Sequence, residues 1–114
     1  RDFIYSDDVA IGMMKVVEQG YNKPINLGSG KGIRIKEIAE TIASLMSDEC
    51  EIVWDTSKPS GDNKRLMCTE RASSIGIESK VSLREGIKNT INWYINNKDD
   101  VNLRYNAFTD KVYK

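Results

Sequence analysis

Short apolar runs alternate along this chain with longer stretches in which apolar residues recur at helical spacing. The short runs at residues 3–5, 24–27 and 51–54 are candidate strands, each followed by a polar or Gly-containing segment. Strands that alternate with helices favour parallel pairing through helical crossovers. The pattern therefore predicts an α/β protein.

Four helices are expected between and after these strands. The first has apolar residues on one face between positions 9 and 17, with Ser6 or Asp7 as its cap and Gly20 at its end. The second covers residues 35–46 and is the most clearly amphipathic. A two-turn helix capped by Thr69 is expected to end at Gly76. The last begins at the capping box of Ser82 and Glu85 and places these residues on its buried side: Leu83, Ile87, Ile91, Tyr94 and Ile95.

The predicted sheet is too thin to stand alone. Three short parallel strands leave exposed edges, which favours part of a larger sheet over a complete one. The chain also begins with Arg1 and Asp2, so a piece of a longer polypeptide is expected. Its longest apolar run, residues 9–14, is far shorter than the roughly 20 residues that a membrane span requires.

Charge and composition exclude several classes of function. Lys and Arg number 17 and Asp and Glu number 17, so no dominant positive field favours nucleic acid or anionic membranes. The chain has no His, which removes the commonest general base and metal ligand. Cys50 and Cys68 are too few and too far apart for a zinc site or a disulfide framework. They are expected to be buried reduced thiols, which indicates a cytoplasmic location.

Three motif-like features do not carry chemistry. The Gly-rich loop at residues 28–32 lacks the first Gly and the final hydroxyl of a Walker loop, and Ile33 stands where a dinucleotide fingerprint needs its third Gly. Tyr94 and Lys98 have the spacing of a dehydrogenase catalytic pair, but Tyr94 falls on the apolar stripe of the last helix. Asp7 and Asp8 point about 100° apart on a helix, so capping and the helix dipole explain them better than catalysis.

Several segments, in order, resemble a known family. Residues 1–10 (RDFIYSDDVA) are similar to a segment of extended short-chain dehydrogenases that act on nucleotide sugars, and residues 26–30 (NLGSG) to the end of their next strand. Residues 54–61 (WDTSKPSG) resemble most closely the GDP-L-fucose synthases within this NAD-dependent epimerase/dehydratase family. Residues 82–94 and 105–108 resemble the end of the same proteins.

The resemblance implies that residues 1–114 form the C-terminal, substrate-binding portion of a nucleotide-sugar epimerase/reductase. Short parallel strands with packed helices would then belong to an incomplete Rossmann-type sheet. The parent would use NADP and a GDP-sugar, converting GDP-4-keto-6-deoxymannose to GDP-L-fucose, and would be a homodimer. The cofactor loop and the catalytic Ser/Thr, Tyr and Lys would lie upstream, so this portion alone would be non-catalytic, without a cofactor or metal site. The tail, residues 98–114, has no assigned role.

The resemblance also implies the substrate-binding residues. Arg1 and Lys58 occupy positions at which the family contacts the nucleotide diphosphate, and Lys64 and Arg65 lie where it often has basic residues. Guanidinium and ammonium groups bind a diphosphate through charge-assisted hydrogen bonds. Taken without the resemblance, Arg1 and Lys58 are better explained as ordinary solvated charges, because exposed charges are the default.

Departures from the family pattern leave a second interpretation open. Ser6, Cys68, Ile77 and the pair Asp62 and Asn63 replace residues that are usual in GDP-L-fucose synthases. They weaken the assignment to GDP-fucose chemistry more than the assignment to nucleotide sugars. The alternative function is a stand-alone, non-catalytic α/β binding or interaction module.

Overall fold

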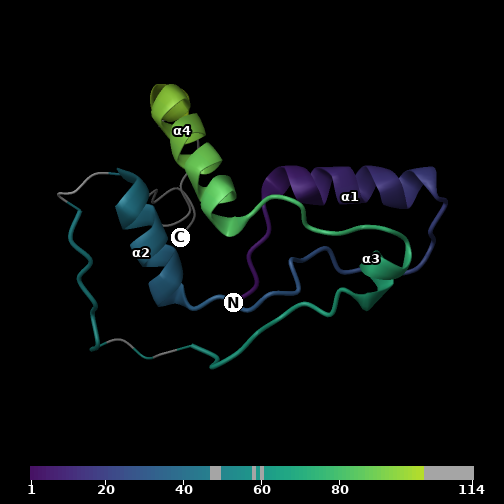
Figure 1. The fold of residues 1–114 in the computed structure, drawn as a ribbon, viewed down its shortest axis with the longest axis horizontal. Helices are drawn as coiled ribbons and strands as arrows, with labels where there is room; N and C mark the ends of the chain where they lie inside the picture. Colours follow the sequence, from purple (N-terminus) through teal and green to yellow (C-terminus); the bar gives the residue numbers. More distant parts are fainter. Residues whose placement is uncertain (47–49, 58, 60, 102–114) are drawn as a thin grey trace, which may run out of the picture.

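The computed structural model describes residues 1–46, 50–57, 59 and 61–101. Helix α1 spans Ser6–Glu18, α2 Ile35–Met46, α3 Glu70–Ser74 and α4 Leu83–Val101. Long extended connections join them (Figure 1). All four helices lie where the sequence predicts them, because each is encoded by a local pattern of apolar residues.

The start of α1 differs from the prediction, whereas its end agrees. The residue before the helix is Tyr5, in extended conformation, and no side chain caps the first turn, so the assignment of Ser6 or Asp7 as the cap is wrong. Ser6 is instead the first helical residue. At the other end Gly20 has a φ of 61°, and its N–H donates to the carbonyl of Val17. A Gly at this position ends the helix without the steric cost of a Cβ atom.

The other helix ends follow local hydrogen bonding. The backbone N–H of Arg34 donates to Oε2 of Glu37 at 3.0 Å at the start of α2. At the start of α4 the N–H of Glu85 donates to Oγ of Ser82 at 3.3 Å, which confirms Ser82 as the predicted cap. Thr69 precedes α3 as predicted, but its side chain makes no capping bond.

Within the described residues, the segments predicted as strands are not paired into a sheet. Residues 3–5, 24–27 and 51–54 have no strand assignment, and the one β-bridge found in these ranges is an antiparallel contact between Asp2 and Gly32. An extended segment becomes a strand only when another segment pairs with it along its length. Their parallel arrangement in a larger sheet stays a prediction.

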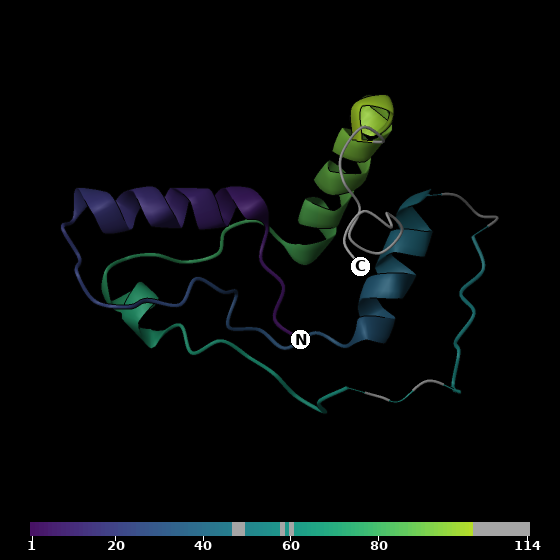
Figure 2. The ribbon, with the colours of Figure 1, turned by 180° about the vertical axis from the view of Figure 1, so that it is seen from behind.

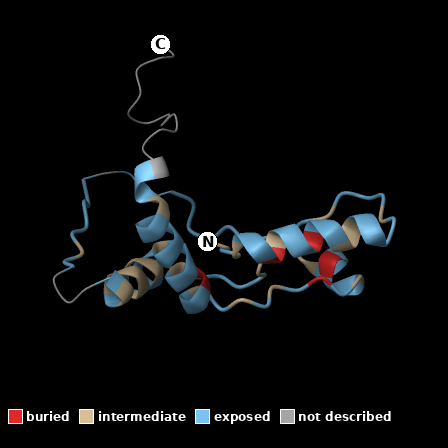
Figure 3. Ribbon diagram, turned by 90° about the horizontal axis from the view of Figure 1, so that it is seen from above, coloured by how far each residue is buried: buried red, intermediate tan, exposed pale blue. Residues whose placement is uncertain are grey.

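Most of the buried residues lie around α1 and α3, and one more, Gly86, lies in α4 (Figure 3). Asp8, Gly12, Ala72 and Ile77 are buried around α1 and α3. A Cβ atom on Gly12 would lie 3.1 Å from Leu27 and 3.2 Å from Ile77, so the absence of a side chain lets α1 approach both. This small core holds α1, residues 24–27 and residues 72–77 together.

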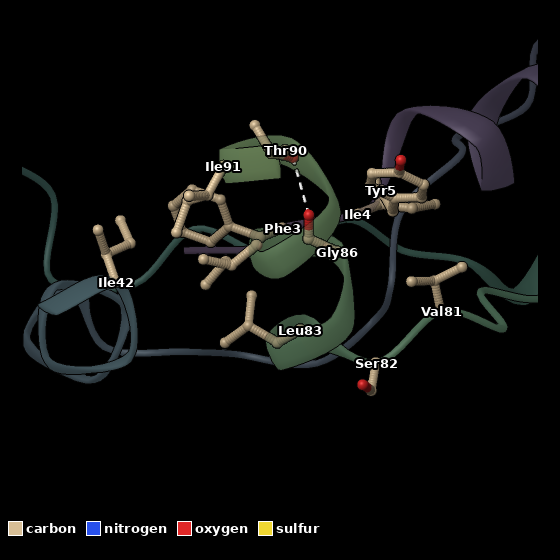
Figure 4. A pocket seen from close by; sticks show the side chains of 11 residues that line it. Phe3, Ile4, Tyr5, Ile42, Val81, Ser82, Leu83, Gly86, Thr90 and Ile91 are labelled. Carbon is tan, nitrogen blue, oxygen red and sulfur yellow. Dashed lines mark hydrogen bonds between the residues drawn. The ribbon is translucent and has the colours of Figure 1, made fainter. Parts of the chain in front are cut away.

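Helices α2 and α4 form a second packing unit, seen side by side from front and back (Figures 1 and 2). Between them and residues 3–5 lies an apolar cavity of about 240 Å³ (Figure 4). Within α4, Thr90 Oγ1 donates to the carbonyl of Gly86 at 2.8 Å beside this cavity. The side chains around it include Phe3, Tyr5, Ile42, Leu83, Ile87 and Ile91.

Several predicted burial states are wrong. Leu83, Ile87 and Ile91 are half-buried on α4, but Tyr94 and Ile95 are 53% and 57% exposed, because α2 covers the first half of α4 rather than its whole length. The two thiols are free and exposed rather than buried. Among the described helices, none combines the length and the hydropathy needed to cross a bilayer.

Candidate anion-binding site

The candidate site begins at the contact between the first residues and the segment before α2. The backbone nitrogen of Arg1 donates to the carbonyl of Ile33 at 2.8 Å, and the N–H of Ile33 donates to the carbonyl of Arg1 at 2.9 Å. Together with the bridge between Asp2 and Gly32, these bonds place Arg1 beside the start of α2. Two segments that are 32 residues apart are thereby joined.

The guanidinium group of Arg1 reaches across to the segment that follows Pro59. Its NH1 donates to the carbonyl of Asp62 at 2.7 Å. A Cβ atom on Gly61 would lie 3.0 Å from NH2 of the same guanidinium, so Gly61 allows the chain to pass close by. One of the five donors of Arg1 therefore positions this segment, while others stay available for a ligand.

A cavity of about 710 Å³ with both polar and apolar lining residues opens between these segments. Arg1, Arg34 and Lys64 line it, together with one acidic residue, Asp62. In the described part of the chain no carboxylate lies within salt-bridge distance of these three cations. Positive charges that converge on a concave surface attract anions. The remaining lining residues are Gly32, Ile33, Ile35, Gly61, Asn63 and Leu66.

The structure brings together two of the four residues that the sequence singles out. Arg1 and Lys64 line the same cavity, whereas Arg65 is not among its lining residues. Lys58 lies outside the described residues. Sequence reasoning missed Arg34, although a basic residue between a Gly-rich loop and a helix start is a recognisable signal for anion binding.

Asp2 occupies hydrogen-bond donors of the Gly-rich loop at residues 28–32. Its Oδ1 accepts from the N–H and the hydroxyl of Ser29 at 2.8 and 2.6 Å, and its Oδ2 accepts from the N–H groups of Gly30 and Met67 at 3.1 and 3.3 Å. Burial raises the pKa of the Asp2 carboxyl, but the hydrogen bonds from Ser29, Met67 and Gly30 outweigh burial and hold that pKa below its usual value. The loop amides thus already bind an anion of the chain itself.

The same contacts bear on cofactor and metal binding. Because Asp2 occupies the amides of Ser29 and Gly30, this loop does not fit the pyrophosphate of a dinucleotide. Among the described residues, no group of three His, Cys, Asp or Glu side chains is close enough to hold a metal ion.

The paired carboxylates do not form a catalytic pair. Asp8 is 6% exposed, and its Oδ2 accepts from the hydroxyl of Ser79 at 3.1 Å and the N–H groups of Lys80 and Val81 at 2.9 Å each. Asp7 is exposed, and its Oδ1 accepts from the hydroxyl of Ser6 at 3.4 Å. Asp8 thus ties α1 to the segment before α4, a structural role other than the predicted cap.

Comparison with known proteins gives the chain its relatives. It is 34% identical over 98 residues to the GDP-L-fucose synthase 1 of Arabidopsis thaliana, and this match covers 85% of this chain and 30% of that protein. It is 30% identical over 109 residues to the GDP-L-fucose synthase of Escherichia coli, and this match covers 87% of this chain and 34% of that protein. This chain is a homologue of the GDP-L-fucose synthases.

The GDP-L-colitose synthase of Yersinia pseudotuberculosis is also 30% identical, over 102 residues. No family model matches the chain. The chain spans about a third of the length of these relatives. These relatives are named for two different GDP-sugar products.

Proposed function

We propose that this chain is the substrate-binding portion of an NADP-dependent nucleotide-sugar epimerase/reductase similar to the GDP-L-fucose synthases. The cavity beside Arg1 would hold the diphosphate of a GDP-sugar. One observation carries the proposal: Arg1 and Lys64, which are far apart in the sequence, line one cavity in a chain whose relatives are named for GDP-sugars.

The chemistry of the cavity suits a diphosphate ester, which carries two negative charges. The planar guanidinium of Arg1 can donate two parallel hydrogen bonds to phosphate oxygens, and Lys64 can add a mobile point charge. Lys58 remains a proposed contributor through the resemblance of its segment, whereas Arg65, which does not line the cavity, would add only a weak longer-range attraction. Asp62 and Asn63 offer polar groups that can bind hydroxyl groups of a sugar.

The remaining parts of the proposal concern the intact enzyme. NADP binding, proton transfer and hydride transfer would be the work of residues outside this chain. Residues 3–5, 24–27 and 51–54 would add to a Rossmann-type sheet there. A homodimeric parent and a cytoplasmic location belong to the same proposal, and the two free cysteines are compatible with a reducing compartment.

The direct test measures the dissociation constant of GDP for the intact natural polypeptide that carries this sequence. Arg1→Ala should weaken binding about 10-fold or more, because it removes charge-assisted hydrogen bonds. Lys88→Ala removes an exposed cation of α4 that does not line the cavity, and it should leave the Kd within about twofold.

Arg1→Lys, which keeps the charge and loses the fork, should give an intermediate Kd. A wild-type protein that binds no GDP, or an Arg1→Ala variant that binds as tightly as Lys88→Ala, would contradict the proposal. An intact protein that binds GDP but does not turn over a GDP-4-keto-sugar with NADPH would instead fit the non-catalytic binding module.

A further inference from the structure

We infer that Arg34 is a third diphosphate-binding residue of this site, one that neither the motifs nor the resemblance singles out. The inference rests on the proposed function and adds to it a named residue and a charge requirement. Arg34 immediately precedes α2 and lines the cavity together with Arg1 and Lys64.

The backbone around Arg34 is fixed on both sides. Ile33 exchanges two hydrogen bonds with Arg1, at 2.8 and 2.9 Å. The N–H of Arg34 itself donates to Oε2 of Glu37 at 3.0 Å. The two arginines are therefore held on paired segments, so the distance between their Cα atoms does not depend on a flexible loop. Such preorganisation lowers the entropy cost of binding one ligand with both side chains.

The charge balance of the cavity indicates why a third cation is needed. Arg1 and Lys64 together with the carboxylate of Asp62 give a net charge of one positive unit. Arg34 raises the net charge to two positive units, which equals the opposite charge of a diphosphate ester. Its guanidinium keeps its charge at any physiological pH and can donate two parallel hydrogen bonds to phosphate oxygens.

The α2 helix provides a matched control. Lys36 lies two residues after Arg34, does not line the cavity, and forms an exposed ion pair with Glu40 at 3.7 Å. Arg34→Gln and Lys36→Gln remove the same charge from nearly the same place in the sequence. An effect of overall charge on ligand attraction would be similar in both variants, whereas a direct contact would be lost in the first alone.

The experiment measures the Kd of GDP-mannose, a diphosphate ester, and of guanosine, which has no phosphate, for the intact polypeptide by calorimetry. Arg34→Gln should raise the Kd of GDP-mannose about 10-fold or more and leave guanosine binding unchanged. Lys36→Gln should change the Kd of GDP-mannose less than about twofold. The salt dependence of GDP-mannose binding should also be weaker in Arg34→Gln, because one screened charge contact has been removed.

Equal Kd values for Arg34→Gln and Lys36→Gln would overturn the inference. If Arg1→Ala still weakened binding in that case, the proposed function would stand without Arg34. A wild-type protein that does not bind GDP-mannose would overturn both. If Arg34→Gln lowers the Tm, the Arg34→Lys variant, which keeps the charge, is measured in its place. Its Kd for GDP-mannose should lie between those of wild type and Arg1→Ala. A Kd equal to that of wild type would exclude a bidentate contact.

Discussion

The carboxylate of Asp8 accepts a hydrogen bond from the backbone N–H of Lys80 at 2.9 Å, although the two residues are 72 positions apart. The same oxygen accepts from Val81 at 2.9 Å and from the hydroxyl of Ser79 at 3.1 Å. One buried side chain thereby satisfies three donors of the connection between α3 and α4. It also sets where α4 begins relative to α1.

Removing this carboxylate is expected to destabilise the protein. Asp8→Ala should lower the free energy of unfolding by about 2 to 3 kcal/mol, because partly buried donors lose their acceptor. Asp7→Ala removes the neighbouring exposed carboxylate from the same first turn and should cost less than about 1 kcal/mol through the helix dipole alone. Urea denaturation of the intact polypeptide measures both values. Equal losses would show that the three hydrogen bonds contribute nothing.

Asp2 should make stability depend on pH at the acidic end. The pKa of its carboxyl is lower in the folded chain than the usual 3.8, so its stabilising effect is fully present above 3.8 and is lost as the pH falls through the folded pKa. Asp2→Asn should therefore be less stable than wild type at neutral pH. The difference in the free energy of unfolding should disappear once the pH is below the folded pKa of the Asp2 carboxyl. An NMR titration of the Asp2 carboxyl carbon with a midpoint at or above 3.8 would contradict this assignment.

The close approach at Gly12 predicts a steric effect on stability. Gly12→Val should lower the free energy of unfolding by about 2 kcal/mol or more, because the Cβ atom of the new side chain would already lie 3.1 Å from Leu27 and 3.2 Å from Ile77. Ala10→Val, at an exposed position of the same helix, should cost only about 0.5 kcal/mol through helix propensity. Thermal and urea unfolding would compare the two. If Gly12→Val lowers the free energy of unfolding no more than Ala10→Val does, the neighbouring side chains of Leu27 and Ile77 must move aside at little cost.

Two adjacent cations allow the cavity to be tested against the resemblance. Lys64 lines the cavity and Arg65 does not, as expected for neighbours in an extended segment, whose side chains point to opposite sides. Lys64→Gln should raise the Kd of GDP by about 3- to 10-fold, and Arg65→Gln should change it less than about twofold. Isothermal calorimetry on the intact polypeptide measures both. The reverse order would show that residues 62–66 bind in another orientation.

Local patterns in the sequence predicted the four helices. The spacing of apolar residues located them, and Gly20, Gly76 and Ser82 marked three of their ends, because helix periodicity and capping depend on residues a few positions apart. The same patterns predicted extended segments but not their pairing. Strand pairing joins distant parts of the chain, and within the described residues it appears only between Asp2 and Gly32.

The site needed the tertiary structure. The sequence identified Arg1 and Lys64 as basic residues, but whether two charges share a ligand depends on distances that composition and spacing do not contain. The hydrogen bonds between Arg1 and Ile33 brought Arg34 to the same cavity, and the carbonyl of Asp62 positioned the segment that carries Lys64. Bonds between residues more than 30 positions apart made these decisions, so they were visible only once the chain was folded.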